Sequence, residues 1–148
     1  MSQDYEADAD ELKEAISHAY GLLIKAYGDE EVFPFPYTIA LPDGDEEGYL
    51  LGDLMESVTN AVKALGAIPA DAVHPMRISI LTQISMHWIA AGASFIGFCH
   101  HPNRPMFDAV HFCVYAMGKE MAMWVGMATG AVEMPDWISP EDEEGGEG

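Results

Sequence analysis

Apolar residues recur at spacings of three and four in residues 8–27 and 49–65, as they do in helices that bury one side, and two later stretches, 76–98 and 105–132, are apolar almost throughout. Glycine or proline lies near the ends of these stretches, where such residues commonly start or stop a helix. The later connections are short, which favours antiparallel neighbours. The sequence therefore predicts an all-α fold, a four-helix bundle-like single domain with helices at residues 8–27, 49–65, 76–98 and 105–132.

The first connection, residues 29–48, is predicted to be an irregular, proline-rich insert between the first two helices. Three prolines within it exclude a long helix, because proline has no backbone N–H to donate and its ring clashes with the preceding turn. We expect an ordered loop that lays apolar side chains over the helices, namely Phe33, Phe35 and Ile39.

The third and fourth predicted helices are apolar on almost every side, and no formal charge occurs from Ile78 to Cys99. A helix without a polar side must be covered on most sides, and the two shorter helices cannot cover both. We therefore expect a homodimer. Small residues at every fourth position of the last helix would let two helix backbones approach closely, either inside one chain or between two copies. The predicted oligomer interface consists of Gly118, Ala122, Gly126 and Gly130.

Acidic residues are concentrated in two parts of this 148-residue chain, which has 25 acids, 6 bases and a net charge of −19. Fifteen acids and two lysines give −13 in residues 1–56, residues 57–132 carry +1, and seven acids give −7 in residues 133–148. This balance argues against direct nucleic-acid binding and against docking on an anionic membrane. We expect a helical domain at 1–138 and, because 139–148 contains no residue that could bury apolar area, a disordered acidic tail there.

The charge distribution predicts an acidic interaction module that binds or inhibits a basic protein partner. Immunity proteins, antitoxin-like inhibitors and phage anti-defence proteins have this character, and clustered carboxylates can also mimic nucleic-acid phosphates. The alternative is that the acids only keep an apolar bundle in solution. The predicted partner-binding residues are Asp43, Asp45, Glu46, Glu47, Asp53 and Glu56.

Two groups of residues resemble metal sites without completing one. Residues 43–50 follow the first eight positions of a calcium-binding EF-hand loop, but the twelfth position, which needs a bidentate Glu, is Leu54. A second group has ligand-type side chains without a structural-zinc spacing: Cys99, His100, His101, Asp108, His111 and Cys113. We therefore predict no metal, no cofactor and no catalytic residue. A ligand- or metal-binding bundle, with or without enzymatic activity, is the alternative function.

The first residues lack the basic start and apolar run of a secretory signal, so we expect a cytoplasmic protein with thiol cysteines. The apolar surroundings of both cysteines predict that they are buried. A membrane hairpin is a further alternative, because 78–99 is long enough to span a bilayer. Polar residues dispersed along that segment and a mean hydropathy of only +0.02 for the chain argue against it.

Overall fold

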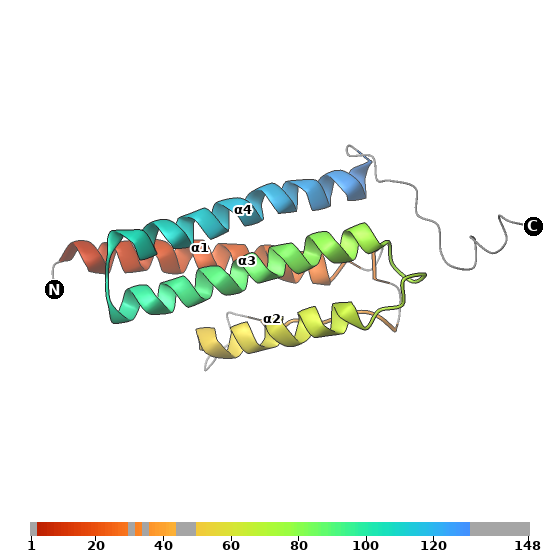
Figure 1. Cartoon of the computed structure of the whole chain (residues 1–148), viewed down its shortest axis with the longest axis horizontal. Coiled ribbons are helices and arrows are strands. Elements are labelled where there is room, and N and C mark those ends of the chain that lie inside the picture. Colours follow the sequence, from red (N-terminus) through yellow and green to blue (C-terminus); the bar gives the residue numbers. More distant parts are fainter. Residues whose placement is uncertain (1–2, 30–31, 34–35, 44–49, 131–148) are drawn as a thin grey trace, which may run out of the picture.

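The computed structural model describes residues 3–29, 32–33, 36–43 and 50–130 (Figure 1). These residues form four helices and no strand, which confirms the predicted all-α, bundle-like fold. The predicted tail at 139–148 lies outside the described residues. The helices are α1 (Gln3–Tyr27), α2 (Leu51–Gly66), α3 (Pro75–His100) and α4 (Arg104–Thr129).

Polar side chains and glycine set the helix ends. The His74 Nδ1 atom accepts a hydrogen bond from the Met76 N–H at the start of α3, and Asn103 Oδ1 accepts one from the Met106 N–H at the start of α4. Gly130 ends α4 in the left-handed conformation, with φ of 83°, which glycine adopts without steric cost. The predicted helix bounds are confirmed to within two residues, except that α1 begins five residues earlier than predicted and α4 ends at Thr129, three residues before the predicted end at 132.

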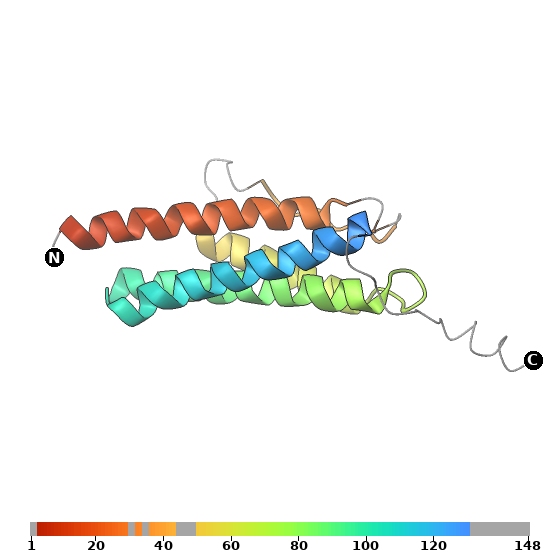
Figure 2. The same cartoon turned by 90° about the horizontal axis from the view of Figure 1, so that it is seen from above.

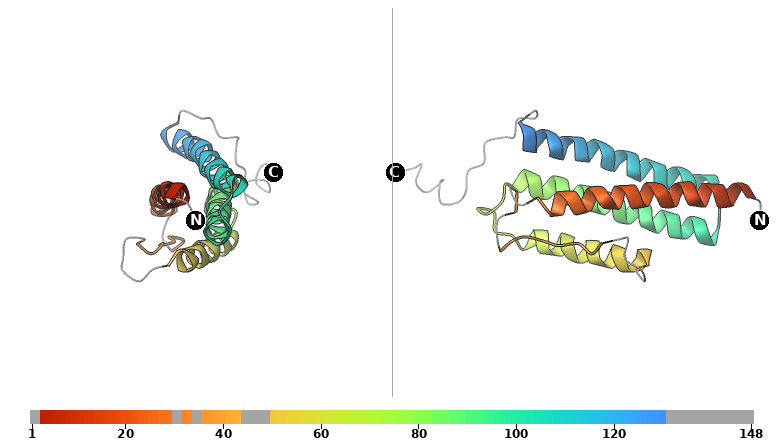
Figure 3. Two further views of the ribbon diagram at one scale, coloured as in Figure 1. Left: turned by 90° about the vertical axis from the view of Figure 1, so that its left-hand side faces the viewer. Right: turned by 180° about the vertical axis from the view of Figure 1, so that it is seen from behind.

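The helix α3 is central, because it packs against each of the other three helices. Its neighbours α2 and α4 lie on either side of it, and together the three helices form a curved layer with α1 on its concave side (Figure 3). The helix α1 also packs against α4, along a line that Figure 2 shows from above. Within the described residues α1 and α2 do not pack against each other, although both lie against α3.

The core is a continuous set of apolar side chains between α1 and the layer. Trp88 of α3 is fully buried, its ring contacts that of Tyr20, and its Nε1–H donates a hydrogen bond to the Ile16 carbonyl of α1. The insert covers this core as predicted: Phe33 is fully buried and stacks near Trp124. Ile39 also packs against the core, whereas Phe35 lies outside the described residues.

Candidate functional site

Exposed carboxylates gather on α1 and on the first turns of α2. The first half of α1 exposes Glu6, Asp10, Glu11 and Glu14, while its buried positions, such as Leu12 and Ile16, face the core. Asp53 and Glu56 are exposed on α2. We call these six carboxylates the acidic side. In the described residues the outer positions of α3 offer no carboxylate to extend it.

Three of the six predicted partner-binding residues can be placed. Asp43, Asp53 and Glu56 are exposed, whereas Asp45, Glu46 and Glu47 lie outside the described residues. The Asp53 carboxylate also accepts a hydrogen bond of 3.2 Å from the Leu50 N–H, so it stabilises the first turn of α2. Asp53 therefore has a structural role that the sequence pattern did not distinguish from partner binding.

A second surface, on the outer positions of α3 and α4, is apolar and exposed. The exposed fractions are 53% for Met86 on α3 and 70%, 64% and 36% for Phe112, Tyr115 and Met123 on α4. Ala90 of α3 is also exposed. We call these five residues the apolar face. On α4 they recur at spacings of three and eight, a second stripe that lies beside the buried one and that sequence reasoning missed.

A contact between α3 and α4 holds Glu120, an acid close in sequence to the exposed residues of α4. The Nδ1 atom of His87 on α3 lies 2.6 Å from a carboxylate oxygen of Glu120 on α4, and the Glu120 side chain is only 15% exposed. The Glu120 charge is therefore held between the two helices instead of facing solvent. Lys119 also lies beside the α4 stripe, and its ammonium is 4.9 Å from the Tyr115 ring centroid.

The four residues of the predicted oligomer interface do not share one environment. Gly118 and Ala122 are exposed, and among the described residues no atom lies within 4 Å of a Cβ placed at Gly118. Gly126 is buried, and Gly130 ends the helix. Among the glycines of α3, Gly92 closely approaches Met55 of α2, and Gly97 closely approaches Met106 of α4.

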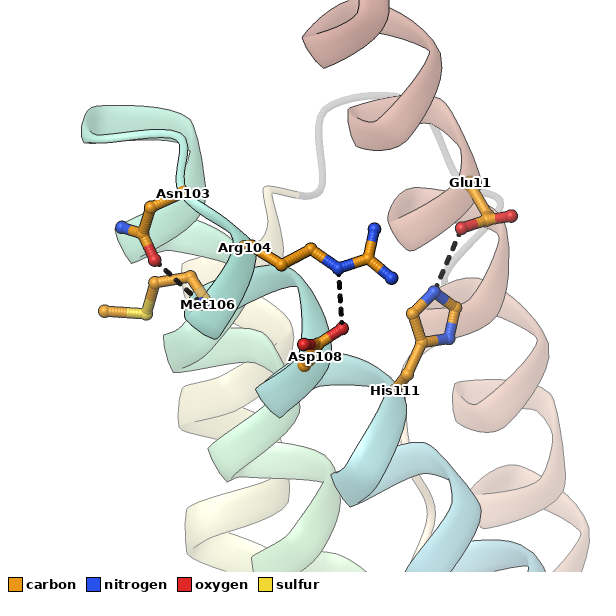
Figure 4. Close-up of polar contacts among 6 residues, drawn as sticks. All are labelled: Glu11, Asn103, Arg104, Met106, Asp108 and His111. Atoms are coloured by element: carbon orange, nitrogen blue, oxygen red, sulfur yellow. Dashed lines mark hydrogen bonds and ion pairs between the residues drawn. The ribbon is translucent and has the colours of Figure 1, made fainter.

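Asp108 and His111, near the start of α4, take part in two separate contacts (Figure 4). Asp108 pairs with Arg104 at 3.1 Å, and His111 reaches across to Glu11 of α1 at 3.0 Å. In the part of the chain that the structure describes, no three acidic, cysteine or histidine side chains converge as a metal site.

The cysteine environments correct one prediction. Cys99 is exposed, not buried, because in the last turn of α3 the neighbouring Phe98 occupies the buried position and Cys99 does not. Cys113 is half-buried, and burial raises the pKa of its thiol. Neither environment is the electropositive one that activates a cysteine for catalysis.

The described helices include none with both the length and the hydropathy needed to cross a bilayer, so the membrane-hairpin alternative gains no support from them. Comparison of the chain with protein-family models, with curated proteins and with solved structures found no match. The function must therefore be argued from the two surfaces themselves.

Proposed function

We propose that this chain is a cytoplasmic protein-interaction module that pairs with a second copy through the apolar face and binds a basic protein partner through the acidic side. The observation that carries the proposal is the separation of the two surfaces. Exposed carboxylates occupy α1 and the start of α2, and exposed large apolar side chains occupy the outer positions of α3 and α4. The immunity, antitoxin-like and anti-defence inhibitors are the classes of protein with this character.

Self-association is proposed at the apolar face because its five residues carry no negative charge. Two copies with a net charge of −19 each repel one another, so they can approach closely only where few carboxylates meet. The apolar face meets this condition, because its five residues are uncharged, the Glu120 carboxylate is held against His87, and α1 with its acids lies on the concave side of the layer. Asp108, one turn before Phe112, is paired with Arg104. Burying a large apolar side chain stabilises an interface by about 1.5–3 kcal/mol, and a two-fold interface buries each one twice.

Binding of a basic partner follows from the density of charge on the acidic side. Carboxylates at successive turns of α1 attract Lys and Arg side chains over a distance set by ionic strength, which accelerates encounter and disfavours acidic competitors. A groove that binds nucleic-acid phosphates responds to this same pattern of negative charge. The acidic side thus supports an inhibitor that occupies such a groove on its partner.

A matched pair of charge reversals tests the acidic side. The double variant Asp10→Lys, Glu14→Lys removes charge from α1, and the control Asp71→Lys, Asp108→Lys changes net charge equally at exposed positions elsewhere. Each immobilised protein is used to capture partners from its native host at about 0.1 M and about 1 M salt, where the Debye length falls from about 10 Å to about 3 Å.

The expected result is a basic protein retained at low salt by the wild type and by the control, but not by the α1 variant. Loss of that protein from both variants would show that net charge alone is responsible. Retention by all three proteins would remove the acidic side from the proposal.

The apolar face is tested by measuring the oligomeric state with light scattering at micromolar concentrations. Phe112→Glu should give a monomer, and Leu50→Glu is the matched control, because both side chains are 70% exposed and only Phe112 belongs to the apolar face. Circular dichroism should show that both variants keep the wild-type helix content. A wild-type monomer, or a dimer that survives Phe112→Glu, would contradict the proposed interface.

A further inference from the structure

A groove lies between α1 and α2, because both helices pack on α3 but not on each other. It encloses a cavity of about 250 Å³. Aromatic side chains of α3, Trp88 and Phe95, form part of its lining, together with Ile16 and Tyr20 of α1 and Leu54 of α2. This groove belongs to neither the acidic side nor the apolar face.

The polar atoms of the aromatic lining already have partners within the chain. The Tyr20 hydroxyl donates a 2.7 Å hydrogen bond to the Pro42 carbonyl, and Trp88 Nε1–H donates one of 3.1 Å to the Ile16 carbonyl. A ligand in the groove would therefore meet mainly ring and aliphatic surfaces, and the donors of the lining, the Ser17 hydroxyl and the Lys13 ammonium, belong to exposed side chains of α1. Such a lining favours an apolar ligand and penalises the burial of a charge.

The charged residues that line the groove are exposed and carry opposite signs. Lys13 is followed directly by Glu14 and preceded by Asp10 on α1, and Asp43 lies on the insert. The positive charge of Lys13 is thus surrounded by acids in a chain with a net charge of −19. This field disfavours an anionic ligand.

Gly21 leaves part of the groove wall without a side chain. It lies in the interior of α1, where glycine destabilises a helix by about 1 kcal/mol relative to alanine. Among the described residues no atom lies within 4 Å of a Cβ placed there, so close packing inside the chain does not account for the glycine. The space beside Gly21 is instead continuous with the cavity that this residue lines.

We propose that the groove binds a small aromatic molecule that carries no negative charge. An engineered apolar cavity of about 150 Å³ holds benzene, so a cavity of this larger size suits a fused bicyclic ring of roughly ten heavy atoms. Phe95 is the half-buried ring of the lining, whereas Tyr20 and Trp88 are 3% and 0% exposed. Contacts between aromatic rings contribute about 0.5–1.5 kcal/mol beyond area burial. The site is independent of the two protein-binding surfaces, so its failure would leave the proposed function intact.

Indole is the probe, and its binding is followed by NMR titration of the wild-type protein. The expected result is saturable one-to-one binding that shifts the Trp88 indole N–H signal and the amide signals around Gly21. Indole-3-acetate, which adds a carboxylate to the same ring, should bind at least threefold more weakly. Absence of saturation, or tighter binding of the anion, would overturn the proposal.

Gly21→Leu tests the location by filling the groove, and Gly66→Leu is its control. Both glycines lie in helices with no described atom within 4 Å of an added Cβ, but only Gly21 lines the cavity. Gly21→Leu should weaken indole binding at least tenfold, and Gly66→Leu should leave it within twofold. Gly21→Ala, a smaller change that also improves helix propensity, should weaken binding by an intermediate factor.

Thermal unfolding of each variant identifies any loss of fold before binding is interpreted. If folded Gly21→Leu and folded Gly21→Ala both bind indole as tightly as the wild type, the ligand does not occupy this groove and the proposal is wrong. Chemical-shift changes confined to the outer positions of α3 and α4 would assign indole to the apolar face and would likewise overturn it.

Discussion

Replacing Ser85 with alanine should destabilise the protein more than its small volume suggests, because Ser85 joins two buried hydrogen bonds. Its hydroxyl donates to the Leu81 carbonyl at 2.7 Å and lies 2.6 Å from the Tyr27 hydroxyl. Since the single Ser85 proton is used on Leu81, Tyr27 must be the donor in the second bond. Both side chains are buried, with exposed fractions of 0% and 1%.

The two single substitutions should lower the free energy of unfolding by different amounts, because they leave different groups without a hydrogen-bond partner. Ser85→Ala leaves the Tyr27 hydroxyl without its acceptor in the core and should cost about 1–3 kcal/mol of unfolding free energy. Tyr27→Phe keeps the bond from Ser85 to Leu81 and should cost about 0.5–1.5 kcal/mol. The double variant has no unpaired tyrosine hydroxyl, so it should be less destabilised than the sum of the two.

The assay is chemical denaturation of the four proteins of this cycle, followed by circular dichroism. Thr82→Ala provides a control, because the Thr82 hydroxyl bonds to the Ile78 carbonyl in the same helix and has no bond to Tyr27. Combined with Tyr27→Phe, it should be additive within about 0.5 kcal/mol. The reasoning fails if Ser85→Ala lowers the free energy of unfolding no more than Tyr27→Phe does. It also fails if the effects of Ser85→Ala and Tyr27→Phe are additive in their double variant.

Three further predictions concern pH, a helix start and a close helix contact. Burial raises the pKa of Tyr27 to about 12, so the unfolded chain loses the hydroxyl proton at a lower pH than the folded chain does. The free energy of unfolding should therefore fall as the pH rises above 10, and it should fall less in Tyr27→Phe. Asn103→Ala should lower the free energy of unfolding, measured by urea titration, by about 1 kcal/mol, because the Met106 N–H loses its acceptor. Gly92→Leu should lower the thermal midpoint more than Gly92→Ala, since an added Cβ already lies 2.9 Å from the flexible Met55 side chain. If a variant gives the same value as the wild type in one of these measurements, the prediction for that residue is wrong.

The helices were predictable because each one has a local signal that packing did not override. Pro75 begins α3, and Gly28 directly follows α1. The earlier start of α1 has a tertiary contact to support it, because Tyr5 packs edge-on against Phe98 of α3 and extends the buried stripe by about two turns beyond Leu12. Tyr5 lies seven residues before Leu12, so the stripe itself contained this signal.

The arrangement of the helices was not predictable in the same way. An apolar stripe says that a side is buried, but not which neighbour covers it. The groove exists because α2 packs on α3 alone among the helices described, and Gly92 beside Met55 determines how closely it does so. Small residues on α4 looked equivalent in the sequence, yet Gly118 is exposed and Gly126 is buried. Their difference depends on the rotation of α4 about its axis, which the whole core determines.

The two proposed surfaces should respond to salt in opposite directions, and this response separates them without any substitution. Added salt screens the repulsion between two copies of charge −19, while burial of Phe112 and Met86 depends little on screening, so the dimer should tighten as salt rises. Attraction between the acidic side and a basic partner is screened as well, so that complex should weaken.

Analytical ultracentrifugation across about 0.1 M to about 1 M salt measures the first response, and binding of the captured partner over that same range measures the second. A dimer that dissociates on adding salt would mean that charged contacts, rather than the apolar face, hold the copies together. A partner complex that is insensitive to salt would point to apolar contacts in place of the acidic side. Only opposite slopes agree with carboxylates on α1 and α2 and with apolar residues, Met86 and Phe112 among them, at the exposed positions of α3 and α4.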